Sequence, residues 1–336
     1  MTHFLALETS CDETAAAVFT DELTVLSSVV ASQHELHTRF GGVVPEIASR
    51  AHLRNLLPVI DEALHKAGIT LADVGCIAVH NTPGLVGALL VGVTAAKTLA
   101  LALSVPLVAV NHVASHIYAC RLAAGRDIFP CVGLVVSGGH TALFQCDSAL
   151  EMTLLGGTRD DAAGEAFDKV GAILGLGFPG GPAVEREAMS GSATAFAFPR
   201  AFSDTGRLEF SFSGLKTAVL YAAHGQNLKD APPPTGLKRA DLAASFQEAV
   251  CDALALKCKQ ALRQSGLNRL AVGGGVSANK RLRAKLEAAC AGEGAELFIP
   301  PLNLCTDNAA MAALAVEKWK LARFAPPELD AEPNYI

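Results

Sequence analysis

The chain has 336 residues, of which 51% are hydrophobic and 18% are charged, and its formal net charge is -6. This length exceeds one typical domain and the apolar content is ample for a large buried core, so two domains are expected. The acidic balance does not indicate a protein that binds nucleic acid through its overall electrostatic field. A polyanionic partner would need local basic patches, and the candidates are Lys238, Arg239, Lys280, Arg281, Arg283 and Lys285.

Cysteine usage and the first residues predict the compartment. Nine cysteines are scattered along the chain without a CxxC pair, which is typical of a reduced compartment and argues against a disulfide framework or a zinc ribbon. The first ten residues, MTHFLALETS, have no basic stretch and carry Glu8, so they do not resemble a secretory signal. A cytoplasmic protein is expected.

Two segments share one pattern of strands. Residues 4–19, FLALETSCDETAAAVF, predict two apolar strands joined by a polar turn, and residues 131–146, CVGLVVSGGHTALFQC, repeat that pattern. Apolar residues at helical spacing follow each pair, at residues 52–68 and 241–262. The repetition indicates an internal duplication, and strands alternating with helices favour an α/β fold.

The most apolar segment is LVGALLVGVTAAKTLALALSVPLVAV, residues 85–110. Its length suits a membrane span, but Lys97 and Pro106 interrupt it, and its glycines and threonines form a small-residue face suited to close packing. We therefore expect a buried helix that is followed by a short strand.

Directly after this segment, NHVASHIYA places His112 and His116 four residues apart. On a helix both imidazoles lie on one face, where they can bind one metal ion. One buried and one solvated histidine would give the same spacing. A zinc-protease helix has a general-base glutamate directly after its first histidine, whereas Val113 stands here, so peptide cleavage is not indicated. A third ligand must come from elsewhere.

Two glycine-containing segments are suited to anions. The turn VSGGH, residues 136–140, can converge backbone N–H groups on an anion, although ordinary hairpins use similar turns. The segment LAVGGGVSANKRL, residues 270–282, runs from a strand through three glycines into a helix, a geometry that seats a phosphate or nucleoside. It contains neither GKS or GKT nor GxGxxG.

Two acidic segments have both structural and functional interpretations. DDAAGEAFDK, residues 160–169, is explained by a solvated helix with Asp161 and Glu165 on one face, while Asp168 is a candidate contact for ribose hydroxyls or an amine. In LCTDNAAMAA, Asp307 suits the N-cap of a helix. As a third metal ligand it would complete a set of two histidines and one carboxylate, which is typical of non-haem iron.

Ten motifs follow one another along the chain: ETSCDET, GGVVPEIASRAH, PGLVGALLVG, the histidine pair, VSGGHT, DDAAGEAFDK, FPGGP, FSFSGLKT, GGGVSAN and CTDNAAM. In this order they closely resemble the bacterial TsaD family of tRNA N6-adenosine threonylcarbamoyltransferases, from about residue 4 to 320. The resemblance implies two ribonuclease-H-like domains of the actin, hexokinase and Hsp70 group around a central nucleotide cleft. The expected domains are residues 1–125 and 126–336, with the option that the last helix packs back on the first domain.

The resemblance also implies a reaction and its partners. Threonylcarbamoyl would pass from threonylcarbamoyl-adenylate to the N6 amine of the adenosine next to the anticodon in tRNA, with release of AMP. The implied partners are tRNA and the accessory proteins TsaB and TsaE, without a membrane. The implied cofactor is one divalent metal ion, with iron(II) favoured and zinc as the alternative.

Site residues are carried over one by one. The metal ligands match His112, His116 and Asp307. The substrate contacts match Val135, Val136, Ser137, Gly138, Gly139, Asp168, Gly181, Glu185 and Asn279, and Glu185 falls where many relatives carry Asp. The sequence does not choose a proton acceptor among Asp12, Glu13 and His140.

The sequence departs from the family pattern at two positions, and three rival functions stay open. Thr82 stands at the first glycine of the GPGL motif, and Ala114 stands where bacterial relatives often carry Glu. The rivals are a metalloprotease, a sugar kinase or ATPase, and a noncatalytic scaffold.

Overall fold

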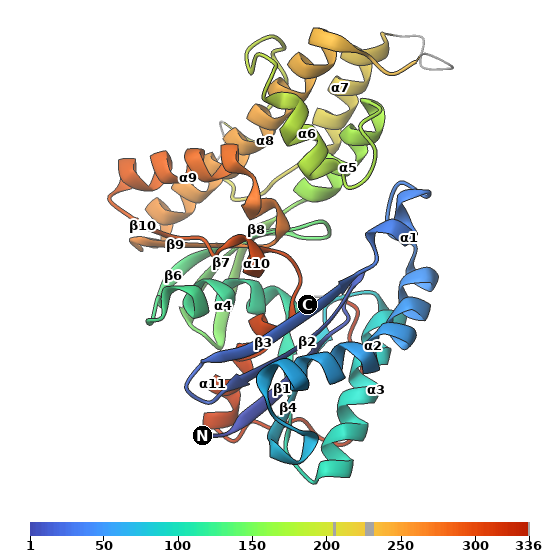
Figure 1. Cartoon of the computed structure of the whole chain (residues 1–336). Helices are drawn as coiled ribbons and strands as arrows, with labels where there is room; N and C mark the ends of the chain where they lie inside the picture. Colours follow the sequence, from blue (N-terminus) through green and yellow to red (C-terminus); the bar gives the residue numbers. More distant parts are fainter. Residues whose placement is uncertain (204–205, 226–231, 335–336) are drawn as a thin grey trace. The chain divides into compact units, whose positions relative to one another are not determined.

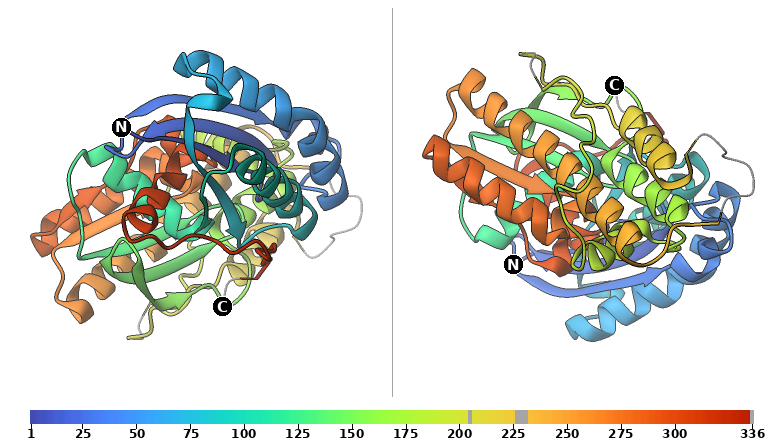
Figure 2. Two further views of the ribbon diagram at one scale, coloured as in Figure 1. Left: turned by 90° about the horizontal axis from the view of Figure 1, so that it is seen from below. Right: turned by 90° about the horizontal axis from the view of Figure 1, so that it is seen from above.

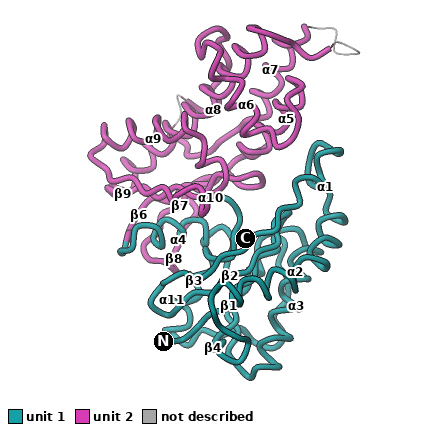
Figure 3. The backbone as a smooth tube through the Cα atoms, in the orientation of Figure 1, with its two compact units in different colours: residues 1–127, 306–336 teal, residues 128–305 magenta. Residues whose placement is uncertain are grey.

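The structure is a computed structural model that describes residues 1–203, 206–225 and 232–334. The chain forms two compact units, unit 1 with residues 1–127 and 306–336 and unit 2 with residues 128–305 (Figure 3). The segment after residue 305 thus belongs to unit 1. As limits of independent domains, residues 1–125 and 126–336 stay a prediction.

Unit 1 contains a five-stranded mixed sheet in the order β3-β2-β1-β4-β5. The strands are β1 (His3–Glu8), β2 (Glu13–Thr20), β3 (Val25–Ser32), β4 (Val74–Thr82) and β5 (Leu107–Asn111). β1 pairs antiparallel with β2 and parallel with β4. β1 and β2 are almost wholly buried, which is expected for central strands covered on both faces.

Helices cover the strands of unit 1. α2 (Pro45–Ala67) contacts β2 and β3, and α3 (Val86–Leu103) contacts β4 (Figures 1 and 2). α4 (His112–Ala124) and η3 (Ala309–Leu314) pack against one another, and η3 also contacts β1 and β2. The remaining elements are α1 (His34–Thr38), η1 (Leu71–Asp73) and α11 (Ala315–Lys320). Through η3, the end of the chain reaches the middle of this sheet.

Unit 2 repeats the strand arrangement, with the order β10-β9-β6-β7-β8. The strands are β6 (Cys131–Val136), β7 (Thr141–Ser148), β8 (Glu151–Gly157), β9 (Arg269–Gly273) and β10 (Glu296–Phe298). β6 is antiparallel to β7 and parallel to β9, as β1 is to β2 and β4. The predicted duplication and the α/β class are confirmed.

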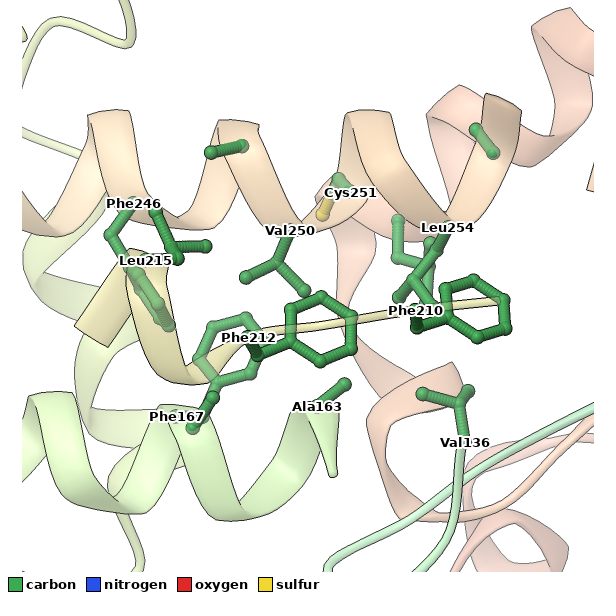
Figure 4. Close-up of a cluster of buried hydrophobic side chains, with 14 of the residues drawn as sticks. Val136, Ala163, Phe167, Phe210, Phe212, Leu215, Phe246, Val250, Cys251 and Leu254 are labelled. Carbon is green, nitrogen blue, oxygen red and sulfur yellow. The ribbon is translucent and has the colours of Figure 1, made fainter. Parts of the chain in front are cut away.

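Helices of unit 2 enclose an aromatic core. These are α5 (Ala163–Ile173), α6 (Gly180–Ala188), α7 (Ser213–His224), α8 (Gly236–Ser265), η2 (Gly275–Ala278), α9 (Lys280–Glu293) and α10 (Leu302–Cys305). Phe167 of α5 packs edge-on against Phe246 of α8, with Phe210 and Phe212 beside them (Figure 4). Burial of these large rings fixes α5 on α8.

The apolar helix predicted after residue 85 is α3. Among the described residues it is the one helix that is long and apolar enough to cross a membrane, and 33% of that window is buried. Ala88, Leu89, Val93 and Ala96 are buried toward the sheet, whereas Leu101 is 83% exposed. α3 is thus buried along the face that packs on the sheet and exposed on the opposite face. The predicted burial therefore holds for one face of the helix.

Candidate functional site

The histidine pair lies at the start of α4, directly after β5. The side chain of Asn111 accepts the Ala114 N–H at 2.9 Å and so caps the helix. His112 and His116 lie on one face of α4 with ring centroids 4.7 Å apart, and both are buried. The capped helix thus holds the two rings at the position that the sequence predicted.

Asp307 joins the histidines from the segment that returns to unit 1. Its Oδ1 lies 3.2 Å from His116 Nε2 and 3.6 Å from His112 Nε2. The interpretation of Asp307 as an N-cap is wrong, because the Asn308 side chain accepts the Met311 N–H at 3.1 Å and caps η3. Asp307 therefore faces the histidines and does not cap a helix.

These three residues form a candidate metal site. One ligand atom from each lies within 4.8 Å of the others. Within the described part of the chain, His116 Nδ1 is buried without a hydrogen-bond partner, and Nε2 faces the Asp307 carboxylate, an arrangement that fits a metal ligand. Two imidazole nitrogens and one carboxylate oxygen suit a divalent transition metal and leave open coordination positions.

The electrostatics of this site couple the carboxylate to the imidazoles. Burial opposes protonation of His112, but the charges of Asp307 and Glu8 outweigh it and raise the pKa of His112 to about 9. Burial lowers the pKa of His116. Burial opposes ionisation of Asp307, and the nearby histidines nevertheless lower its pKa. A metal ion at this set competes with protons, so its binding depends on pH.

Two of the three predicted proton acceptors lie near the metal site in unit 1. His34 Nδ1 lies 3.6 Å from Asp12 Oδ2, and its Nε2 lies 3.9 Å from Glu13 Oε1. Burial, followed by the charges of Asp307 and Asp12, raises the pKa of Glu13 well above its ordinary value. Burial also opposes ionisation of Asp12, but the interaction with neighbouring His34 lowers its pKa.

The third acceptor, His140, closes the glycine turn of unit 2. The Ser137 N–H donates to the His140 carbonyl at 2.8 Å, and the His140 N–H donates to Ser137 Oγ at 3.1 Å. A side chain on Gly138 or Gly139 would meet nothing within 4 Å. Both glycines are exposed, so there is open space beside the backbone of this turn, and its use as an anion site stays a prediction.

Predicted substrate contacts gather around the carboxyl ends of β6 and β9. Val135 of β6 is in register with Gly273 of β9, and the Gly164 N–H at the start of α5 donates to the Ser137 carbonyl at 3.1 Å. A Cβ on Gly274 would lie 2.4 Å from the Val136 carbonyl oxygen. Carboxyl ends of neighbouring parallel strands are where open α/β sheets bind ligands.

Asp168 and Gly181 lie where α5 meets α6. The Gly180 N–H donates to Asp168 Oδ1 at 2.7 Å, so the carboxylate also anchors the first turn of α6. A Cβ on Gly180 would lie 2.4 Å from the Phe167 carbonyl oxygen, whereas a Cβ on Gly181 would meet nothing within 4 Å. Gly180 is thus required by a close backbone approach, whereas there is open space beside Gly181.

Glu185 and Asn279 meet at the start of α9. The Lys280 N–H donates to Glu185 Oε1 at 2.8 Å. The Asn279 Oδ1 accepts the Leu282 N–H at 2.9 Å, and its Nδ2 donates to Gln247 at 2.8 Å. Both side chains thus hold the helix N-terminus in place, which the sequence did not predict for Glu185.

The two departures from the family pattern lie in unit 1. Ala114 contributes its N–H to the α4 cap and no metal ligand. Thr82 ends β4, and its hydroxyl donates to the Asn334 carbonyl at 3.5 Å. Neither residue alters the candidate metal ligands.

Sequence reasoning missed two polar anchors. Glu8, at the end of β1, has no exposed surface and contacts His112. A charged residue at the end of an apolar strand could have indicated this buried contact. Asp160 accepts the hydroxyls of Ser211 and Ser213, each at 2.6 Å, and the Phe212 N–H at 2.8 Å. The two serines of the FSFSG segment could have indicated that a carboxylate accepts their hydroxyls. Asp160 precedes α5 and anchors the start of α7.

Several residues of the candidate basic patches form ion pairs with carboxylates of unit 2. Arg281 makes a bidentate pair with Glu248 at 2.6 and 2.7 Å, and Lys285 lies 2.6 Å from the same carboxylate. Arg239 likewise pairs with Glu187 at 2.9 and 3.3 Å. The charges of these two guanidinium groups are thus offset by carboxylates of unit 2 itself.

Comparisons with solved structures identify the fold. Component A of the (R)-2-hydroxyglutaryl-CoA dehydratase of Acidaminococcus fermentans is 14% identical with a TM-score of 0.54, covering 95% of this chain and 99% of that one. Full-length HypF in its phosphate- and nucleotide-bound form is 13% identical with a TM-score of 0.63, covering 96% and 56%. These likenesses confirm the predicted fold group of actin, hexokinase and Hsp70, and show the fold alone.

Comparisons of sequence identify the family. The model described as TsaD, tRNA N6-adenosine threonylcarbamoyltransferase, matches residues 24–314. The protein of that name from Rhodopirellula baltica is 51% identical over 98% of this chain and 96% of its own. The protein of the same name from Anaeromyxobacter dehalogenans is 52% identical over 100% of this chain and 99% of its own length. The chain belongs to the TsaD family of tRNA N6-adenosine threonylcarbamoyltransferases.

Proposed function

We propose that this protein transfers the threonylcarbamoyl group from threonylcarbamoyl-adenylate to the N6 amine of the adenosine next to the anticodon in tRNA, releasing AMP. The observation that carries this proposal is the agreement with relatives of that activity, 51–52% identical over nearly the whole chain. The cluster of His112, His116 and Asp307 supports an active member of the family and argues against a degenerate scaffold.

The candidate metal site would hold one divalent ion, with iron(II) favoured and zinc as the alternative. Such an ion supplies Lewis-acid stabilisation to substrate oxygens. The chain itself contributes rigidity, because α4 is capped by Asn111 and η3 by Asn308. Ligands on fixed elements hold a substrate without reorganisation. Positioning two reactants in this way can lower the activation barrier by up to about 7–11 kcal/mol.

In unit 2, the proposed adenylate contacts are Val135, Val136, Ser137, Gly138 and Gly139. The accessible backbone of the two glycines supports a phosphate contact at this turn. Asp168, Gly181, Glu185 and Asn279 are proposed to orient the nucleoside and threonyl parts. The anchoring of Glu185 to α9, and of Asn279 to Gln247, supports a preformed surface for these groups.

Of the three candidate proton acceptors, Glu13 has the electrostatics that this role favours. General bases work best when their pKa is near the working pH, and burial beside Asp307 and Asp12 raises the pKa of Glu13 well above that of an ordinary glutamate. As a carboxylate, Glu13 would take the proton that the N6 amine loses on attack. Asp12, whose pKa is lowered, would stay ionised beside it.

The remaining proposals concern partners and compartment. The target adenosine lies in a single-stranded loop of tRNA, where its base can be reached without melting a duplex. TsaB and TsaE are proposed as accessory proteins, and the compartment as the cytoplasm. Nine free cysteines, eight of them buried, agree with a reducing environment.

The deciding experiment reconstitutes the transfer. The full chain is mixed with TsaB, TsaE, threonylcarbamoyl-adenylate and unmodified tRNA, and N6-threonylcarbamoyladenosine is quantified by mass spectrometry. We expect product from wild type and from His65→Ala, which removes an exposed histidine on α2, and none from the double variant His112→Ala, His116→Ala.

Each alternative result has a defined meaning. Equal product from the double variant and wild type would keep the function and refute the metal role. Absence of product from a folded, metal-loaded wild-type complex would refute the transferase proposal. ATP consumption with a small acceptor and without tRNA would favour the kinase.

A further inference from the structure

We propose that Glu8 is a positioning residue of the candidate metal site, holding the His112 ring by Nδ1 so that Nε2 is presented to the metal beside Asp307. The proposal rests on the metal-binding part of the proposed function and not on the transfer reaction. It assigns a role to a buried carboxylate that binds neither substrate nor metal.

Glu8 ends β1 with no exposed surface, and both of its oxygens are engaged. Its Oε1 accepts the Ser10 N–H. Its Oε2 lies 3.0 Å from His112 Nδ1 and 2.7 Å from His80 Nδ1. Burying a carboxylate in this central strand costs free energy unless such donors surround it. We therefore infer that Glu8 has a function at this position.

The chemistry of imidazole turns this contact into a constraint on the metal ligand. A carboxylate oxygen accepts and does not donate, so the contact favours the form of His112 with its proton on Nδ1. In the neutral ring that binds a metal, the lone pair of His112 then resides on Nε2, the atom that lies 3.6 Å from Asp307 Oδ1. Metal-bound histidines commonly donate their other ring N–H to a carboxylate, which fixes the tautomer and the ring orientation.

His80 connects this carboxylate to the metal helix by a second route. From β4, its Nδ1 lies against Glu8, and its Nε2 lies 3.0 Å from Ser115 Oγ on α4. The Ser115 hydroxyl also donates to the Asn111 carbonyl at 2.9 Å. Glu8 is therefore placed by β1, β4 and α4 together, and it cannot rotate away from His112 without breaking these contacts.

One rival hydrogen bond must be separated from this proposal. Ser10 Oγ lies 3.1 Å from His112 Nδ1, so its hydroxyl is also within reach of the ring. If Ser10 donated to a bare Nδ1, the proton of His112 would reside on Nε2 and would block metal binding there. The two arrangements predict opposite tautomers and can be distinguished.

The first test measures Zn²⁺ affinity of the full chain by competition with a fluorescent chelator, without tRNA or adenylate. Glu8→Gln keeps the shape of the side chain and should weaken Zn²⁺ binding about 10- to 100-fold, the usual effect of losing such a partner. Glu317→Gln is the matched control, because Glu317 accepts the hydroxyl of Tyr118 on the same helix at 2.6 Å and contacts none of the three ligands. The control should leave the affinity unchanged.

A second measurement needs no substitution at Glu8 and stays decisive if that variant fails to fold. In wild-type chain loaded with Zn²⁺, ¹⁵N NMR of the histidine rings should show a proton on Nδ1 of His112 and none on Nε2. A proton on Nε2 would overturn the proposal, as would an unchanged Zn²⁺ affinity in folded Glu8→Gln. Weakening by Ser10→Ala equal to that by Glu8→Gln would show that the effect is not specific to the carboxylate, and would also overturn the proposal.

These readouts are independent of acyl transfer. A reconstituted complex that makes no modified tRNA while Glu8→Gln still weakens Zn²⁺ binding would refute the proposed reaction and leave the role of Glu8 intact. The converse result, transfer activity with normal metal affinity in Glu8→Gln, would refute only the role of Glu8.

Discussion

Gly274→Ala tests the close backbone approach between β6 and the residue that follows β9. Gly274 follows β9 with φ +96 and ψ 157, a conformation that is essentially restricted to glycine. A Cβ there would lie 2.4 Å from the Val136 carbonyl oxygen and 2.7 Å from its carbonyl carbon. Both are backbone atoms of a central strand, so no side chain can rotate to make room.

The magnitude follows from two additive costs. Holding a non-glycine residue in such a conformation costs about 1–3 kcal/mol. Forcing an extra carbon into a packed site costs about another 1–3 kcal/mol. Gly274→Ala should therefore lower the free energy of unfolding of unit 2 by about 2–6 kcal/mol, a large part of the roughly 5–15 kcal/mol that stabilises a typical domain.

Urea unfolding followed by circular dichroism measures this loss. The matched control is Gly292→Ala in α9, where a Cβ meets nothing within 4 Å. Because glycine is unfavourable inside a helix, this control should be neutral or stabilising by up to about 1 kcal/mol. A Gly274→Ala protein within about 0.5 kcal/mol of wild type would refute the close approach and with it the geometry of this end of the sheet.

Four further predictions test single side chains. Asp307→Asn keeps the size of the third ligand but removes its charge, so Zn²⁺ affinity measured by chelator competition should fall, and an unchanged affinity would exclude Asp307 as a ligand. Arg281→Glu should leave tRNA affinity in filter binding unchanged, because Arg281 is paired with Glu248, and a marked loss would restore the basic patch. Hydrogen bonds from Arg281, opposed by burial and aided by Lys285, lower the pKa of Glu248 to about 2. The stability that ionised Glu248 contributes is therefore present above its ordinary pKa of 4.5 and is lost as the pH falls toward 2, so the difference in thermal midpoint between wild type and Glu248→Gln should disappear over that range. Burial and the charges of Asp307 and Asp12 raise the pKa of Glu13, so the transfer rate should increase as the pH rises through that raised value. In Glu13→Gln this increase of rate with pH should be absent, and the rate should fall about 100-fold or more. A variant with the wild-type pH profile would exclude Glu13 as the base.

Local patterns made the fold predictable. In each strand pair, at residues 4–19 and 131–146, the two strands are adjacent in sequence and largely buried, so their apolar runs are visible without tertiary information. The spacing of His112 and His116 is also local, because a helix alone places them on one face. In each case the residues that must meet are close together in the chain.

Contacts between distant segments could not be predicted in this way. Glu8 and His112 are 104 residues apart, and Asp160 and Ser213 are 53 residues apart. The interpretation of Asp307 as an N-cap failed for a related reason, because Asp307 and Asn308 are both good capping residues and only the packing of η3 decides between them. The internal pairing of Arg281 was equally invisible, since Glu248 lies on a different helix.

The resemblance to the TsaD family named Asp307 as a ligand, and the structure supplies the physical reason. The histidines need only β5 and the cap of α4, which are contiguous in the chain. Asp307 reaches them because residues after 305 return to unit 1, where every residue of η3 is buried against α4, β1 and β2. The same strand, β1, carries Glu8, whose carboxylate contacts His112 Nδ1. One packed region thus places the carboxylate ligand, the histidine pair and the residue that we propose to orient it, so substitutions in η3 that loosen this packing would displace the third ligand and leave the first two in place.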